Sequence, residues 1–93
     1  MSNIPLPTQL KWESQSLAKF NTVIRKIPLF HREIAKLVVT KKAELNAQQR
    51  GSDTVQESDI VRAFFSEVPK AFYSLMIRLL DEVKYNYREY EPK

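Results

Sequence analysis

Few residues in this 93-residue chain could carry chemistry. His31 is the single histidine, and there is no cysteine. A histidine beside Phe30 and Arg32 at a helix start could act as an acid–base group or as an axial ligand to a tetrapyrrole. Because no second histidine, no cysteine and no defined carboxylate partner accompanies it, the sequence favours a surface or helix-capping role for His31.

No pair of carboxylates has the spacing that acid–base catalysis requires. Asp81 and Glu82 are adjacent on an expected helix and therefore point to different faces. Glu57 and Asp59 are explained by the attraction of acidic groups to a helix N-terminus. A single glycine leaves no Gly-rich phosphate loop. We therefore expect a protein that is not an enzyme, with no catalytic residue, no metal site and no cofactor.

Basic residues are concentrated in the first half of the chain. Residues 1–50 carry a net charge of +6 and residues 51–93 carry −2, for a total of +4. This asymmetry can steer a polyanion or an acidic protein face towards the first half, or it can serve solubility alone. The candidate nucleic-acid-binding residues are Lys19, Arg25, Lys26, Arg32, Lys36, Lys41, Lys42 and Arg50. The alternative interpretation of this set is a solvated helix face.

Length and composition set the class of the protein. The chain is 43% apolar and holds ten aromatic residues, which is enough for one compact core. No run of about 18 apolar residues is present, so we expect no membrane span. The start MSNIPLPTQLKW lacks the pattern of a secretory signal. Absence of cysteine fits a reducing compartment, and we expect a cytoplasmic protein.

Apolar spacing predicts four helices. The first covers about residues 14–26 and ends before Pro28, and the second, the longest, covers 29–49. A short third helix and a long fourth one, from Pro69 onward, follow. On the second helix we expect one apolar stripe formed by Phe30, Ile34, Leu37, Val38 and Leu45, interrupted by Lys41, and close approach of a neighbouring helix at Ala35, Ala43 and Ala47.

Gly51 supplies the left-handed residue with which a helix commonly ends. Val55 then predicts a short extended link, and either Thr54 or Gln56 caps the next helix. The fold class is therefore all-α: a compact bundle of about four helices with a short extended link around Val55, partly histone-like. We expect the second and fourth helices to pack together.

The last helix is apolar over more than one stripe. Its second row, Tyr73, Ile77 and Leu80, is the expected partner-binding surface of a homo-oligomer, most simply a dimer. Met76 is an expected core residue. The predicted organisation is an extended lead-in over residues 1–11, a helical domain over 12–85 and a tail over 86–93. Three tyrosines near the tail are expected to pack on the helical body: Tyr85, Tyr87 and Tyr90.

The order of these signals resembles a known family. A Trp, a helix, Ile–Pro–x–Phe–x–Arg, a helix ending in Ala–x–x–x–Gly, a Val-centred link and an acidic helix start are similar to the small C-terminal domain of the 57-kilodalton subunit of light-independent protochlorophyllide reductase, which also occurs as free-standing small proteins. The matching residues are Trp12, Ile27, Pro28, Phe30, Arg32, Ala47, Gly51, Val55 and Asp59. The nitrogenase-like body of that reductase, with its metal-cluster ligands, is absent, and residues 66–93 lie beyond the family pattern.

The resemblance implies a helical accessory module, linked to a tetrapyrrole-related or nitrogenase-like redox system in a photosynthetic organism. It does not carry over the reductase activity. The leading hypothesis for function is a non-catalytic helical protein-interaction module. The alternative is a nucleic-acid-binding module that uses the basic face of residues 19–50. A third hypothesis is pigment or porphyrin binding in an apolar groove near Phe30, Phe64 and Phe65.

Overall fold

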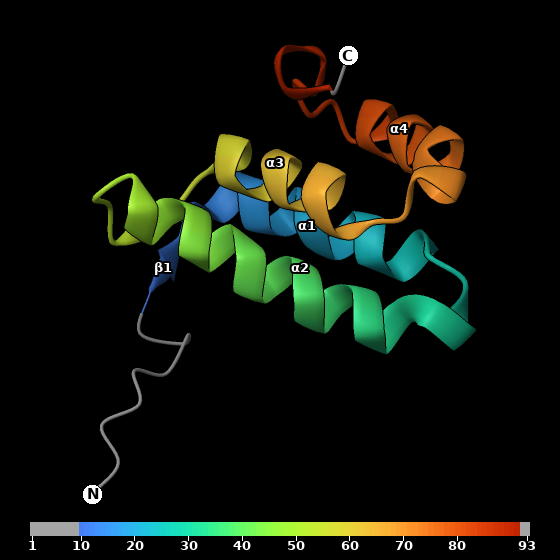
Figure 1. Cartoon of the computed structure of the whole chain (residues 1–93), viewed down its shortest axis with the longest axis horizontal. Coiled ribbons are helices and arrows are strands. Elements are labelled where there is room, and N and C mark those ends of the chain that lie inside the picture. The colour runs from blue at the N-terminus through green and yellow to red at the C-terminus, as the bar shows by residue number, and fades with distance from the viewer. Residues whose placement is uncertain (1–9, 92–93) are drawn as a thin grey trace, which may run out of the picture.

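Four α-helices dominate the computed structural model, which describes residues 10–91 (Figure 1). In chain order the elements are β1 (Lys11–Trp12), α1 (Ser14–Lys26), α2 (Leu29–Gln49), β2 (Thr54–Val55), α3 (Glu57–Glu67), the 3₁₀ turn η2 (Lys70–Phe72), α4 (Tyr73–Glu82) and the 3₁₀ turn η3 (Arg88–Tyr90). The predicted fold class, a compact helical bundle of about four helices, is confirmed.

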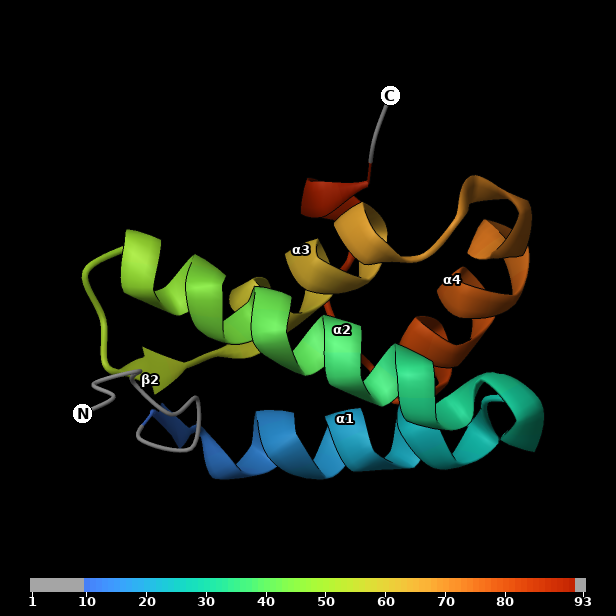
Figure 2. The ribbon, with the colours of Figure 1, turned by 60° about the horizontal axis from the view of Figure 1, so that its bottom comes forward.

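α1 and α2 form an antiparallel pair joined by a tight turn (Figure 2). The Glu13 carboxylate caps α1, because it accepts hydrogen bonds from the backbone N–H groups of Gln15 and Ser16 at 3.0 and 2.8 Å. Pro28 separates the two helices, as predicted. Arg32 then donates to the carbonyl oxygens of Arg25 at 2.8 Å and of Ile27 at 3.0 Å, so that it closes the end of α1.

The end of α2 is a Schellman motif built on Gly51. The N–H of Gly51 donates to the Gln48 carbonyl and the N–H of Ser52 to the Ala47 carbonyl, both at 2.9 Å. Gly51 has φ of 79°, in the left-handed region where a side chain is unfavourable. The predicted role of the single glycine is therefore confirmed.

A two-residue parallel sheet fixes the link that follows α2. Lys11 pairs with Thr54, and Trp12 pairs with Val55. Val55 is fully buried, so the extended link predicted there is confirmed. The partner strand β1 was not predicted, and it draws the end of the predicted lead-in 1–11 into the fold. Leu10 also packs against the core, and residues 1–9 of that lead-in lie outside the described part of the chain.

The face of α2 that is buried differs from the predicted one. Its core residues are Val39, Ala43 and Ala47, on which α3 packs. Four members of the predicted stripe are exposed: Phe30, Ile34, Leu37 and Leu45. Its fifth member, Val38, is half-buried and packs against the core. Small side chains let α3 approach closely, which is why the alanine-containing face is the buried one.

The fourth helix is also different from the prediction. α4 has only ten residues, because the first turn after Pro69 is the 3₁₀ turn η2. It packs chiefly on α1 and α3, whereas the main neighbour of α2 is α3. The prediction of a long second helix is confirmed, because α2 has 21 residues, whereas the predictions of a long fourth helix and of its packing chiefly on α2 are wrong. Met76 is buried, which confirms it as a core residue.

The C-terminal segment packs back on the helices. Tyr85 and Tyr87 are buried, and Tyr90 packs against the core, as predicted. The Tyr85 hydroxyl donates to the Ser16 carbonyl at 2.7 Å, which joins the segment to α1. A second Schellman motif ends α4, with Lys84 at φ 66° in the position that glycine usually occupies.

Candidate functional site

The predicted partner-binding row on the last helix is only partly accessible. Leu80 is fully buried and belongs to the core, so it offers no surface to a partner in this conformation. Ile77 and Tyr73 are half-buried and pack against the core, and the Tyr73 hydroxyl donates to the Phe65 carbonyl. α4 turns this row inward, towards α1 and α3, and it presents Leu75 and the adjoining Phe72 outward instead.

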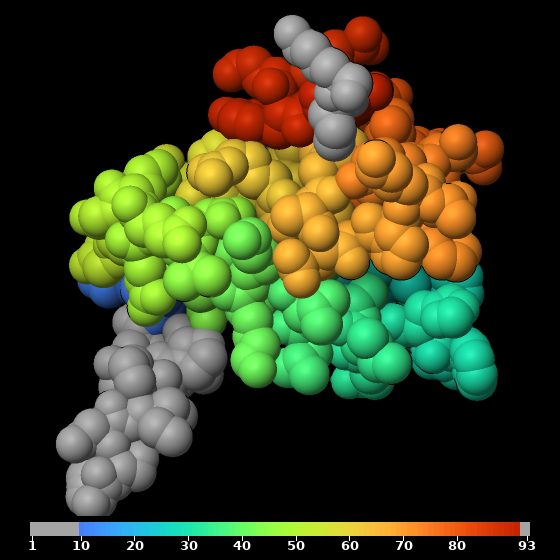
Figure 3. Space-filling model, in the orientation of Figure 1, coloured from blue at the N-terminus to red at the C-terminus, as the bar shows by residue number. Residues whose placement is uncertain are grey.

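An apolar groove of about 440 Å³ lies between the first half of α2 and the η2–α4 segment. These two segments meet on one surface of the molecule (Figure 3). The buried side chains at the bottom of the groove come from three helices: Val23, Phe64, Met76 and Leu79. The exposed side chains at its edges are Phe30, Ile34, Phe72 and Leu75.

The edges of this groove expose large apolar side chains. Phe30 is 89% exposed, Ile34 68% and Phe72 50%. Leu37, at 58%, continues the row on α2 one turn further along. We call Phe30, Ile34, Leu37, Phe72 and Leu75 the apolar face. The sequence analysis placed the α2 members on one apolar stripe but did not show that α2 carries apolar residues on two sides, of which only one faces α3.

His31 lies at the edge of the groove and is flanked by two aromatic rings. Its ring centre is 5.3 Å from that of Phe30, edge-on, and 6.1 Å from that of Phe72. The side chain therefore helps to connect the two sides of the groove. Within residues 10–91 no three His, Cys, Asp or Glu side chains are grouped so that they could hold a metal ion. Of the residues named for a pigment groove, Phe30 and Phe64 line it, whereas Phe65 packs on Tyr73.

Half of the predicted nucleic-acid-binding set is used inside the molecule. Lys26 pairs with Glu82 at 2.8 Å, which links α1 to α4. Lys19 donates to the Lys84 carbonyl at 3.2 Å and lies 3.6 Å from the Glu57 carboxylate. Arg32 donates hydrogen bonds to carbonyl oxygens at the end of α1, and Arg50 forms an ion pair with Asp59. The guanidinium groups of Arg32 and Arg50 therefore fix helix ends.

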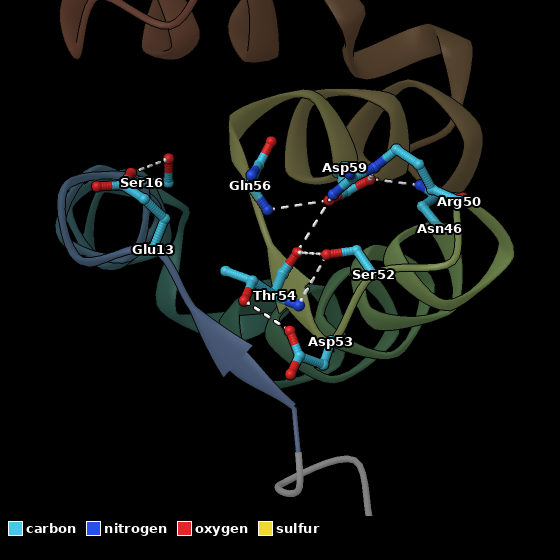
Figure 4. Close-up of polar contacts among 9 residues, drawn as sticks. All are labelled: Glu13, Ser16, Asn46, Arg50, Ser52, Asp53, Thr54, Gln56 and Asp59. Carbon is cyan, nitrogen blue, oxygen red and sulfur yellow. Dashed lines mark hydrogen bonds and ion pairs between the residues drawn. The ribbon is translucent and has the colours of Figure 1, made fainter.

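Arg50 and Asp59 form the most buried ion pair of the described chain (Figure 4). The Arg50 Nη2 lies 2.6 Å from the Asp59 Oδ2, and this hydrogen bonding raises the pKa of the guanidinium. The same Asp59 oxygen accepts from the Gln56 N–H at 2.9 Å, so Gln56 is the N-cap of α3. This site holds the α2–α3 connection and has a structural role.

The other cations of the set reach the surface. Arg25, Lys36 and Lys41 are exposed, and Lys42 is half-buried. The one side-chain contact among them is from Arg25 to the Thr22 hydroxyl at 3.2 Å, within the described residues. Arg25, Lys36 and Lys41 are therefore the exposed members of the predicted set that form no ion pair among the described residues.

A second, polar hollow of about 360 Å³ lies where the C-terminal segment meets α1 and α3. Its two carboxylates already have partners. Glu13 accepts from the Ser16 hydroxyl at 2.6 Å, and Glu57 accepts from the Asn86 N–H at 2.6 Å. The hydrogen bond from the Ser16 hydroxyl is the main cause that lowers the pKa of Glu13, and the backbone N–H groups of Gln15 and Ser16 add to it. Both carboxylates at this hollow therefore have hydrogen-bond partners within the chain, and the hollow marks the place where the C-terminal segment joins α1 and α3.

Comparison of the chain with protein-family models, with curated proteins and with solved structures gives no match. The resemblance to the reductase domain stays a prediction.

No helix within residues 10–91 combines the length and the apolar character that crossing a membrane requires. The function must be argued from the geometry of the groove.

Proposed function

We propose that this chain is a non-catalytic helical protein-interaction module and that its apolar face binds an amphipathic helix of a protein partner. One observation carries this proposal: an apolar groove lies directly beside Phe30, whose side chain is 89% exposed. Contiguous apolar surface of this kind marks interaction sites more often than it serves the fold of the chain.

The shape of the groove supports a helix as the ligand. Two roughly facing helical segments form its sides, and buried side chains from α1, α3 and α4 form its bottom. An amphipathic helix places side chains at i, i+3, i+4 and i+7, which suits such a groove. Burial of a Phe, Ile or Leu side chain contributes about 1.5–3 kcal/mol. Several such contacts on the apolar face suffice for a specific complex.

The nature of the partner is also part of the proposal. The resemblance to the reductase domain makes subunits of a tetrapyrrole-related or nitrogenase-like redox system the first partners to test. Such a partner would present a helix to the groove, and this chain would supply no reacting group.

The test is affinity capture from the native extract, followed by reconstitution with the purified companion. Phe30→Glu places a charge on the apolar face, and we expect at least about tenfold weaker binding of the companion in titration calorimetry. Asn21→Glu, at an exposed α1 position that does not line the groove, is the matched control and should bind normally. Equal binding by both variants would contradict the proposal.

A second candidate function is nucleic-acid binding, which the exposed side chains of Arg25, Lys36 and Lys41 favour. It predicts retardation of DNA or RNA that fades between about 50 and 200 mM salt, because phosphate contacts release counterions. The triple Gln variant at these positions should lose the effect. Absence of retardation at low salt would end this candidate.

A further inference from the structure

The apolar face combines a protruding side chain with a hollow that could receive it. Phe30 projects from the start of α2, and the groove runs beside it, along Ile34 and Val38 towards Leu75. A surface that carries both features can pair with a copy of itself, because each copy then supplies one knob and one hole.

The area of this face fits what a homodimer requires. Large apolar residues expose on the order of 150–250 Å² each when they are fully open, so the exposures of the five face residues amount to roughly 550 Å². A standard interface buries about 800 Å² per partner, of which about 65% is apolar in homodimers. If the face is completely buried, it therefore supplies about the apolar area of one such interface.

The charges around the face also fit self-pairing. Among the residues that line the groove, Glu67 is the single acidic group and there is no Lys or Arg. Along the exposed part of α2 the row has Glu33, Lys36 and Lys41 near it, so both signs of charge are present. A strongly charged partner would require residues of one opposite charge around the apolar face. Residues of both charges around the face suit contact between two identical surfaces.

We infer that the apolar face is covered by the same face of a second copy, with Phe30 of each copy inserted into the groove of the other beside Val38. This inference rests on the proposed function and names the partner. In such a dimer the two α2 helices run antiparallel and are related by a two-fold axis. If Phe30 contacts the partner's Val38, this two-fold axis passes near the residue midway between positions 30 and 38, which is Ile34. Ile34 of one copy then lies next to Ile34 of the other.

The association is tested by sedimentation equilibrium of the full chain from about 1 to 200 µM. We expect a dimer at micromolar concentration. Phe30→Ser should raise the dissociation constant by at least about 100-fold, because each dimer loses two buried Phe side chains. Asn21→Ser, at a position away from the groove, should leave the dissociation constant of the dimer unchanged. Circular dichroism of both variants checks that the fold is retained. A wild-type monomer at 200 µM, or a dimer that Phe30→Ser leaves intact, would overturn the inference.

The position of the axis is tested by crosslinking. Because the chain has no cysteine, Ile34→Cys introduces a single thiol. Oxidation should convert this variant into a disulfide-linked dimer, whereas Ser66→Cys, exposed at the end of α3, should stay monomeric on a non-reducing gel. Equal crosslinking of both variants would refute the geometry.

The two proposals can fail separately. A wild-type chain that is monomeric but binds a companion protein through Phe30 would overturn self-pairing and leave the proposed function standing. A monomer whose companion binding does not depend on Phe30 would overturn both.

Discussion

The carboxylate of Asp59 lies 2.6 Å from Nη2 and 3.1 Å from Nε of Arg50, and it is fully buried. The pair connects the last turn of α2 to the first turn of α3 across the Gly51 turn. Asn46 adds a hydrogen bond from its side-chain amide to the Asp59 carbonyl at 3.0 Å. These contacts hold α3 against α2, which in turn determines which side of α2 is left to the solvent.

We expect Asp59→Asn to lower the free energy of unfolding by about 2–4 kcal/mol. The amide cannot replace both carboxylate oxygens, and removal of one partner from a buried charged pair is strongly destabilising. Urea unfolding followed by circular dichroism measures the change. The matched control is Asp53→Asn, the same substitution at an exposed position, where we expect a change within about 0.5 kcal/mol. Equal losses in the two variants would contradict this role of the pair.

The two Schellman motifs predict that removing a glycine from one of them and adding a glycine to the other have opposite effects on the free energy of unfolding. Gly51→Ala should lower the free energy of unfolding by about 1 kcal/mol, because alanine at φ 79° is strained although no atom lies within 4 Å of the added Cβ. Lys84→Gly should raise the free energy of unfolding by about 0.5–1 kcal/mol, because it relieves the backbone strain at φ 66°. Thermal unfolding measures both. Destabilisation by Lys84→Gly would show that the Lys84 side chain matters more than its backbone.

The parts of the fold that the sequence could predict are those specified by residues close together in the chain. Apolar spacing and Pro28 placed α1 at residues 14–26, and the same spacing with Gly51 placed α2 at 29–49, as observed. The acidic start of α3 was also predicted from Glu57 and Asp59. In each case the signal lies within a few residues of the structure that it specifies.

The missed features depend on residues far apart in the chain. Pairing of Trp12 with Val55 joins strands of two residues each, too short for any periodic pattern. Close approach of a helix at Ala43 and Ala47 was predicted and is observed, but the sequence did not show that this helix is α3 or that its packing selects the buried side of α2. The charge of Arg50 suggested phosphate binding because its partner Asp59 could not be identified from the sequence alone.

The contrast between Leu80 and Phe30 separates core from surface. Leu80→Ala should lower the free energy of unfolding by about 2–5 kcal/mol, because it leaves a cavity at a fully buried position. Phe30→Ala should change the free energy of unfolding of the monomer by less than about 0.5 kcal/mol, since the side chain is 89% exposed. Urea unfolding followed over a series of protein concentrations and extrapolated to the monomer, well below the range in which the dimer forms, measures both. A large loss for Phe30→Ala would place this residue in the core of a single copy.

Glu44 gives this protein a specific dependence of stability on pH. Its carboxyl is 5% exposed and accepts a hydrogen bond from the Trp12 indole at 2.9 Å, while Oε1 has no partner among the described residues. Burial raises the pKa of Glu44, and the Trp12 hydrogen bond offsets only part of this effect. The folded state therefore binds more protons than the unfolded state between the usual glutamate pKa, about 4.3, and the higher folded value.

Stability that depends on Glu44 must consequently fall as the pH rises through this range, and it stays lower at neutral pH. Glu44→Gln removes the titration, so the variant should be more stable than the wild type at pH 7, with the difference shrinking towards pH 4. Glu13 and Glu82, whose pKa values are lowered by hydrogen bonds, act in the opposite direction but are common to both proteins. The difference between the two urea-unfolding series from pH 4 to pH 8 therefore isolates Glu44. Glu33→Gln, exposed on the same helix, is the control. A constant difference across this range would show that the buried carboxyl does not titrate differently in the folded state.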